Sequence, residues 1–204
     1  MSDLEKQITK ATESLIALDP VLGKVISNHG PIARMPRDNY FAALVGSIVG
    51  QQISVKAAAS ILGRLKDMTR LDPVRIAALD DVTIKAIGLS RQKVSYLKDL
   101  AAHFVADASV FNHLENLPDD EVIAELIKVK GIGVWTAQMF LMFTLVRLDV
   151  FAPDDAGLQQ AIKRLYGFEI LPKRAELIVF SERWQPYRTV ASWYLWASLD
   201  NEPS

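Results

Sequence analysis

Cysteine is absent from this chain of 204 residues, and histidine is scarce. Without cysteine the protein has no disulfide, no thiol nucleophile, no zinc finger and no iron–sulfur cluster held by cysteine. The three histidines, His29, His103 and His113, are scattered along the sequence. No two of them stand at metal-ligand spacing, so the sequence does not favour a histidine metal site.

A surplus of positive charge is also absent. The 23 Lys and Arg residues are balanced by 24 Asp and Glu residues, which gives a net charge of −1. Proteins that bind nucleic acid are often strongly basic, so this balance argues mildly against such a partner. It does not exclude one, because binding requires a local basic face rather than a basic total.

Long hydrophobic runs are lacking as well. The apolar stretch 140–146 is too short to span a membrane, and Arg147 and Asp149 follow it closely. Residues 1–6 are polar and lack the apolar core of a signal peptide. We therefore expect no membrane association and a cytoplasmic location, or a nuclear one if the source is eukaryotic.

The sequence does contain helical patterning. Half of its residues are hydrophobic and 23% are charged, which indicates a folded protein of one large domain or two small lobes. Apolar residues recur at helical spacing from Leu4 to Leu18, where Asp19-Pro20 is expected to end the helix and a loop to follow. No segment shows the sustained alternation of a strand, so we predict an all-α protein. Further helices are expected over 40–49 and 55–65, from 73, on both sides of 88, over 118–131, 134–146 and 154–167, and near 175 and 191.

The most informative segment is 126–137, which we predict to be a helical hairpin. Gly131 and Gly133 flank Ile132 between two helices. Glycine tolerates positive φ, so the chain can turn tightly and expose backbone N–H groups beside the positive end of the next helix. Such a turn binds phosphate with little dependence on base sequence, although the same pattern also joins ordinary helix pairs. Three apolar residues are expected to pack beneath the turn and two lysines to add charge beside it: Val129, Ile132, Ala137, Lys128 and Lys130.

A second element follows at Pro153-Asp154-Asp155, where two carboxylates stand at a predicted helix start. One interpretation is structural: one residue caps the helix and the other interacts with its dipole. The functional interpretation uses the same physics. A carboxylate near a helix N-terminus stays ionised at neutral pH, which suits it to stabilise a cation that develops at a sugar carbon.

In this order and spacing, the two elements resemble the helix-hairpin-helix plus Gly/Pro–Asp signature of base-excision DNA glycosylases. In detail the chain resembles the AlkA-type 3-methyladenine DNA glycosylases. The likeness runs from about Tyr40 to Ala197. It includes the junction Gln51-Gln52-Ile53-Ser54, the segment 88–100, the segment 183–188 and Trp196.

The resemblance implies a monofunctional DNA glycosylase of base excision repair. Such an enzyme hydrolyses the N-glycosidic bond of alkylated bases, of the 3-methyladenine or 7-methylguanine type, after flipping the base out of duplex DNA. Asp155 matches the catalytic aspartate, which stabilises oxocarbenium-like character at C1′ and orients the attacking water. Asp154 is expected to be a cap or support. No catalytic metal or organic cofactor is implied.

The resemblance also assigns binding residues. Trp135 and Trp196 match aromatic positions around the pocket, although core packing alone explains many tryptophans. Met139 replaces an aromatic residue found in some relatives. Gln51 and Gln52 stand where relatives insert a side chain into the gap left by the flipped base, and a glutamine that caps the next helix is the alternative. Expected substrate contacts are Trp135, Trp196, Met139 and Gln51, and expected DNA contacts are Gln52, Ser54, Val129, Lys130, Gly131, Ile132, Gly133 and Thr136.

Trp135 also separates two subclasses. In bifunctional members with lyase activity, the matching position is a lysine that forms a Schiff base. Because tryptophan stands there, we expect base removal without strand cleavage. Trp184, Tyr187 and Trp193 are expected to be packing residues.

We accordingly expect residues 1–204 to form a single two-lobed helical glycosylase unit, active as a monomer, with DNA between the lobes. About forty residues precede the matched region, too few for the N-terminal mixed α/β domain of larger AlkA-type enzymes. Three alternatives stay open: a glycosylase for uracil or other deaminated or mismatched bases, a non-catalytic hairpin protein that binds DNA, and a helical scaffold without a DNA role.

Overall fold

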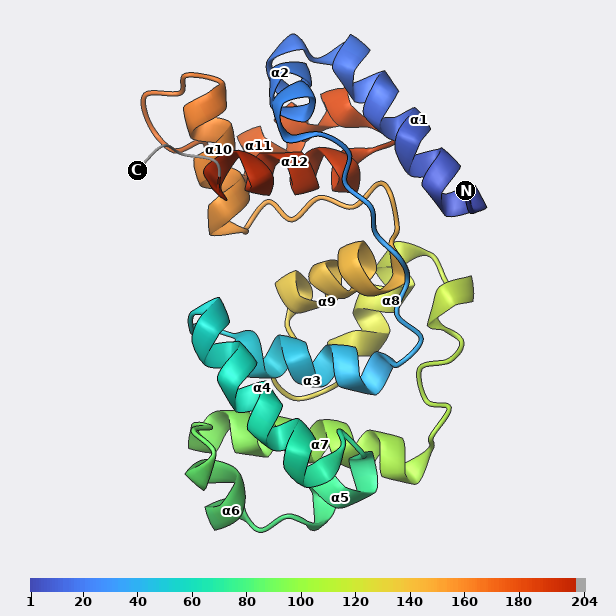
Figure 1. The fold of residues 1–204 in the computed structure, drawn as a ribbon, viewed down its shortest axis with the longest axis vertical. Coiled ribbons are helices and arrows are strands. Elements are labelled where there is room, and N and C mark those ends of the chain that lie inside the picture. The colour runs from blue at the N-terminus through green and yellow to red at the C-terminus, as the bar shows by residue number, and fades with distance from the viewer. Residues whose placement is uncertain (201–204) are drawn as a thin grey trace. The chain divides into compact units, whose positions relative to one another are not determined.

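The computed structural model describes residues 1–200, and its chain divides into two compact units. Unit 1 contains Met1–Pro36 together with the chain from Leu141 onward, and unit 2 contains Arg37–Phe140. Unit 1 therefore joins the two ends of the sequence, drawn in blue and in orange to red in Figure 1. The chain passes between the units twice.

Unit 1 is built around the C-terminal helix. α12 (Arg188–Asp200) packs against α1 (Asp3–Leu18), α2 (Pro20–His29) and α10 (Ala156–Leu165) (Figure 1). A π-helical turn (Leu141–Leu145), α11 (Arg174–Ser181) and a 3₁₀ turn (Glu182–Trp184) complete it. α12 has buried residues on all sides, including Val190, Tyr194 and Leu195, so it forms the core of unit 1.

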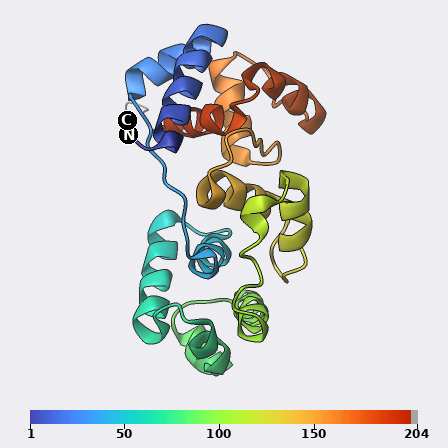
Figure 2. The same cartoon turned by 90° about the vertical axis from the view of Figure 1, so that its right-hand side faces the viewer.

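Unit 2 is built around α3 (Tyr40–Gly50) and α7 (Arg91–Ala106), which lie side by side. α4 (Val55–Thr69) packs on α3, while α5 (Pro73–Ala78) and α6 (Asp81–Ala86) pack on α7 (Figure 2). A 3₁₀ turn (Leu114–Asn116) precedes α8 (Asp119–Leu126), and α9 (Val134–Phe140) follows the predicted hairpin turn. α8 and α9 contact each other, as a hairpin requires.

The prediction of an all-α protein is confirmed for residues 1–200, which contain no strand. Over the same residues no helix combines the length and the apolar composition needed to cross a membrane.

The expectation of a loop after Asp19-Pro20 is wrong, because a second helix, α2, begins at Pro20. Proline fits the first helical position, where its missing N–H has no partner to lose. Asp19 caps that helix, since its side chain accepts hydrogen bonds from the N–H groups of Val21 and Leu22. The dipeptide that ends one helix thus starts the next.

Candidate functional site

Asp155 is the N-cap of α10 in unit 1. Its Oδ1 accepts a hydrogen bond from the backbone N–H of Leu158 at 2.8 Å. The same oxygen accepts a second bond, at 2.9 Å, from the indole Nε1 of Trp196 on α12. Asp155 is only 9% exposed. A carboxylate with two donors on one oxygen is fixed in orientation, which is what a group acting on a developing cation requires.

Gly157 explains how the Trp196 indole comes so close to Asp155. A Cβ at position 157 would lie 3.0 Å from Cδ1 and Nε1 of Trp196 and 3.1 Å from Oδ1 of Asp155. Any side chain there would force the indole or the carboxylate to shift. No role was expected for Gly157 from the sequence, and its position two residues after Asp155 is the signal that could have revealed one.

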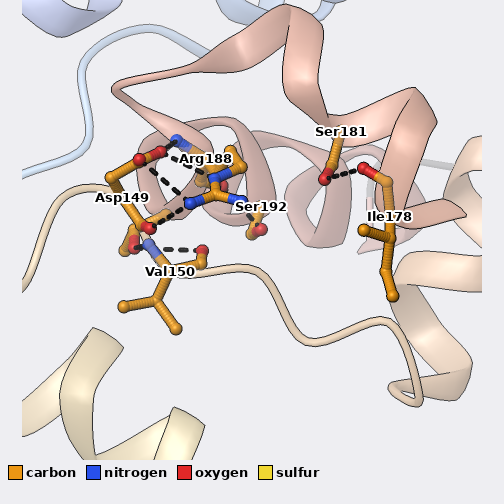
Figure 3. A network of polar contacts seen from close by, with 7 residues as sticks. Asp149, Val150, Ile178, Ser181, Arg188 and Ser192 are labelled. Atoms are coloured by element: carbon orange, nitrogen blue, oxygen red, sulfur yellow. Dashed lines mark hydrogen bonds and ion pairs between the residues drawn. The ribbon is translucent and has the colours of Figure 1, made fainter. Parts of the chain in front are cut away.

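The segment that leads to Asp155 is fastened to the start of α12. The guanidinium of Arg188 donates two hydrogen bonds to the Asp149 carboxylate, at 2.8 and 3.0 Å, and one to the Asp149 carbonyl (Figure 3). Thr189 is buried, and its Oγ1 both accepts from the N–H of Val150 and donates to the Val150 carbonyl. Residues 149–150 are therefore held by the first turn of α12, and Asp155 by Trp196 farther along it.

An aromatic cavity of about 410 Å³ lies next to Trp196 in unit 1. The ring of Phe143 is 5.5 Å from that of Trp196, centroid to centroid. The exposed guanidinium of Arg34 lies 5.6 Å from the centroid of Phe143 and 5.9 Å from that of Trp193. The cavity is lined by His29, Pro31, Ile32, Arg34, Phe143, Trp193, Trp196 and Ala197. The aromatic rings of this cavity can stack on a flat ring, and the Arg34 guanidinium already covers part of their faces.

The hairpin turn in unit 2 has the predicted construction. Gly131 has φ +84°, and a Cβ there would lie 2.1 Å from the Tyr96 ring, so only glycine fits. Val129, Ile132 and Ala137 are buried beneath the turn, as predicted. Gly133 is exposed, and a Cβ at that position would have no atom within 4 Å, so its contribution is an uncovered backbone.

The other predicted hairpin residues differ in accessibility. The Lys130 ammonium donates to Ser95 Oγ at 2.9 Å, and its backbone N–H donates to Asp99. Thr136 is 3% exposed and its hydroxyl lies 3.4 Å from the Gln51 amide nitrogen. Thr136 is therefore internal, and its hydroxyl faces Gln51, so its expected DNA contact stays a prediction.

The junction at 51–54 separates the two glutamines. The Gln51 Nε2 donates to the carbonyl of Gly131 at 2.9 Å, so its side chain is directed to the hairpin. Gln52 is exposed and has φ +56°, a left-handed conformation that side chains rarely adopt. Ser54 caps α4 by accepting from the N–H of Ala57. The two adjacent glutamines thus have different environments.

The predicted site residues fall into two groups, one on each unit. Asp155 and Trp196 belong to unit 1 and are in direct contact. Trp135 and Met139 belong to α9 of unit 2, where Trp135 is 39% exposed and Met139 is half-buried. Core packing therefore does not explain Trp135, whereas it does explain Trp184 and Trp193, which are 0% and 2% exposed.

Asp154 was expected to be a cap or a support, and of these two roles the cap is wrong. Asp155 supplies the cap, and the exposed Asp154 carboxylate pairs with Arg174 at 3.2 Å. The reason is register: an N-cap side chain reaches the N–H three residues ahead, and for α10 that donor is Leu158. Capping and the proposed chemical role thus fall on the same residue.

Comparison with known proteins gives concordant results. The family model described as "HhH-GPD superfamily base excision DNA repair protein" matches residues 45–186. DNA-3-methyladenine glycosylase 1 of Schizosaccharomyces pombe is 31% identical over 202 residues, covering 95% of this chain and 89% of the relative. The same organism's 3-methyladenine DNA glycosylase Mag1, solved with abasic DNA, superposes with a TM-score of 0.85 at 29% identity, covering 94% of this chain and 97% of that one. DNA-3-methyladenine glycosidase of Bacillus halodurans gives 0.79 at 36% identity, covering 94% and 89%.

Proposed function

This chain belongs to the HhH-GPD superfamily of base excision DNA repair proteins, and we propose that it is a monofunctional DNA glycosylase for alkylated bases. The observation that carries the proposal is the carboxylate of Asp155, fixed by Leu158 and Trp196 in a family whose fold it shares. The names of the similar proteins support 3-methyladenine-type lesions as the substrate class. Double-stranded DNA with a damaged base is the partner, and the enzyme acts as a monomer.

In the proposed reaction the bond between C1′ and the base nitrogen breaks, and the base leaves with the electron pair. Positive charge develops at C1′, where the Asp155 carboxylate stabilises it. A water molecule then forms the new C1′–O bond and loses a proton. N3-methyladenine carries a positive charge and departs as a neutral molecule, so the site needs charge stabilisation and stacking more than a strong acid. Trp196 has both functions, because its ring borders the aromatic cavity and its N–H holds Asp155.

Unit 2 supplies the proposed DNA contacts. The uncovered backbone at Gly133 suits phosphate binding, with Lys130 beside the turn. Gln52 is the proposed wedge that fills the gap left by the flipped base, because it is exposed whereas the Gln51 amide is bonded to the hairpin. Trp135 stands where lyase members have lysine, which supports hydrolysis without β-elimination.

A second candidate substrate class is favoured by Arg34. Its guanidinium already lies against the rings of Phe143 and Trp193, where a cationic base would stack. Like charges repel, whereas a guanidinium donates readily to the carbonyl oxygen of a neutral base. Deaminated bases such as hypoxanthine or uracil are therefore the alternative. Under this alternative Arg34→Met slows release of hypoxanthine and not of 3-methyladenine.

The test is single-turnover base release from duplexes that carry 3-methyladenine, 7-methylguanine, hypoxanthine or uracil. We expect release of the methylated bases by the wild-type protein, and no strand cleavage until alkali is added. Asp155→Asn is expected to lose about 2–4 kcal/mol of transition-state stabilisation, or roughly 30- to 1000-fold in rate.

Asp154→Asn is the matched control, because Asp154 is the adjacent carboxylate and only forms an exposed ion pair. It is expected to keep nearly the full rate. Equal rates for Asp155→Asn and the wild-type protein would reduce Asp155 to a helix cap. Absence of release from every duplex would favour the binding-only alternative.

A further inference from the structure

Lys93 on α7 holds the end of α3. Its ammonium donates to the carbonyl of Val49 at 2.7 Å and to the carbonyl of Gln51 at 2.6 Å. The last carbonyls of a helix have no N–H donor within the helix, and they carry partial negative charge. The half-buried lysine satisfies two of them at once, and its burial lowers the pKa of the ammonium group. The chain is therefore fixed at the residue before Gln52.

The side chain of Gln51 makes the next connection. Its amide donates to the carbonyl of Gly131, so one residue joins the exit of α3 to the hairpin turn. Lys93 thus holds the backbone of Gln51, and the Gly131 carbonyl accepts a hydrogen bond from the Gln51 side chain. These bonds lie immediately before Gln52, whose left-handed backbone persists only where neighbours impose it.

α7 also contacts the hairpin turn, through two residues that follow Lys93 along the helix. The Asp99 carboxylate accepts from the N–H of Lys130 at 2.9 Å, and the Tyr96 ring lies against Gly131. Lys93, Tyr96 and Asp99 recur at three-residue intervals, which places them along one side of the helix. A single helix therefore contacts both elements to which DNA binding is assigned.

We propose that Lys93 is a positioning residue that, with the Gln51 amide, imposes the backbone conformation of residues 51–54 and so presents Gln52 to DNA in register with the hairpin. The proposal rests on the function proposed above for its DNA readout. The hydrogen bonds of Lys93 exist in the free protein, so their effect on residues 51–54 is measurable without DNA.

The test replaces Lys93 with Met, which keeps the length and apolar body of the side chain and removes the donor. Lys98→Met is the matched control: Lys98 lies on the same helix, is also half-buried, and also donates to a backbone carbonyl, that of Leu79. Both variants lose ammonium hydrogen bonds to backbone carbonyls, and only those of Lys93 reach the chain that leads into residues 51–54. Amide hydrogen exchange of residues 50–55 in the free proteins should accelerate in Lys93→Met and stay unchanged in Lys98→Met.

The second readout is the dissociation constant for an intact duplex divided by that for a duplex with an abasic site. The loss of the two hydrogen bonds of Lys93, only part of whose free energy reaches DNA binding, predicts about a five- to tenfold smaller ratio in Lys93→Met, with affinity for the intact duplex preserved. In a Gln52→Ala background, Lys93→Met should no longer change the ratio, because the residue being positioned is gone.

Unchanged exchange at 50–55, an equal loss of affinity for both duplexes, or an undiminished effect in the Gln52→Ala background would each overturn the proposal. Base release by the wild-type protein tests the proposed function separately. If the wild-type protein releases no base and Lys93→Met still accelerates exchange at 50–55, the role of Lys93 in holding this segment is supported and the proposed function fails.

Discussion

Asp155 in unit 1 and the chain that leads into Gln52 in unit 2 are both held in place, but by different kinds of partner. In unit 1 a side chain holds a side chain: the Trp196 indole fixes the Asp155 carboxylate. In unit 2 side chains hold backbone: Lys93 donates to Val49 and Gln51, and Gln51 donates to Gly131. The difference follows from what each unit presents. A carboxylate must point in one direction, whereas a wedge and a phosphate-binding turn depend on the course of the chain.

Unit 1 uses the same arrangement twice. Asp19 also caps a helix and also accepts an indole N–H, from Trp184 at 2.9 Å, with Tyr166 as a further donor. Asp19 is 4% exposed and is held by Trp184, which is fully buried, whereas the Trp196 that holds Asp155 borders the aromatic cavity. The same motif thus serves stability at Asp19 and, in the proposed function, chemistry at Asp155. Their surroundings distinguish them.

The largest stability effect is expected where backbone is held, at Gly131. In Gly131→Ala the new Cβ would meet the Tyr96 ring in a backbone region that disfavours it, at a cost of about 2–4 kcal/mol in unfolding free energy. Gly133→Ala, two residues away in open space, should cost less than about 1 kcal/mol. Urea denaturation of both variants measures the difference. Equal stabilities would show that the turn does not need its left-handed glycine.

A smaller effect is expected where a side chain holds a side chain. Trp196→Phe keeps an aromatic ring and removes the N–H that fixes Asp155, which should slow single-turnover base release by about 1–2 kcal/mol, or roughly five- to thirtyfold. Trp184→Phe removes the equivalent donor from Asp19 and should lower stability while leaving the release rate of the folded fraction unchanged. If the two variants have the same kinetic profile, the distinction between the two aspartates is wrong.

The smallest effect is a pH dependence that belongs to Asp19. Burial alone would raise the pKa of this carboxyl, but hydrogen bonds from Tyr166, Trp184 and the N–H groups of Leu22 and Val21 outweigh burial and lower it. A lowered pKa in the folded state contributes stability that is complete above the unfolded value, about 3.9, and is lost as the pH falls through the folded value. Unfolding free energy measured from pH 6 to pH 2.5 should therefore fall in acid, and less steeply in Asp19→Asn. A parallel fall in both proteins would assign the acid dependence to other groups.

The helical content, the hairpin and the helix start at 153–155 were predictable from the sequence for a local reason, whereas the choice of Asp155 came from the family resemblance. Apolar spacing sets helices, two glycines set a turn, and Pro153-Asp154-Asp155 sets a helix start. The local rules also have a limit that the same residues show. They could not tell that Asp155 rather than Asp154 caps α10, or that Asp19-Pro20 begins a helix as well as ending one.

The order of the residues establishes which groups are present: a carboxylate at a helix N-terminus, a glycine turn, adjacent glutamines and a tryptophan at position 135. What each of these groups contacts depends on the packing of the folded chain. Gln51 and Gln52 have the same chemistry, and their roles separate because one amide reaches a carbonyl eighty residues away while the other remains exposed. The importance of Lys93 lies in partners that are distant in sequence. That of Gly157, although it stands two residues after Asp155, lies in the Trp196 indole that packs against it from α12. Such contacts depend on how the helices pack, which local propensity does not encode.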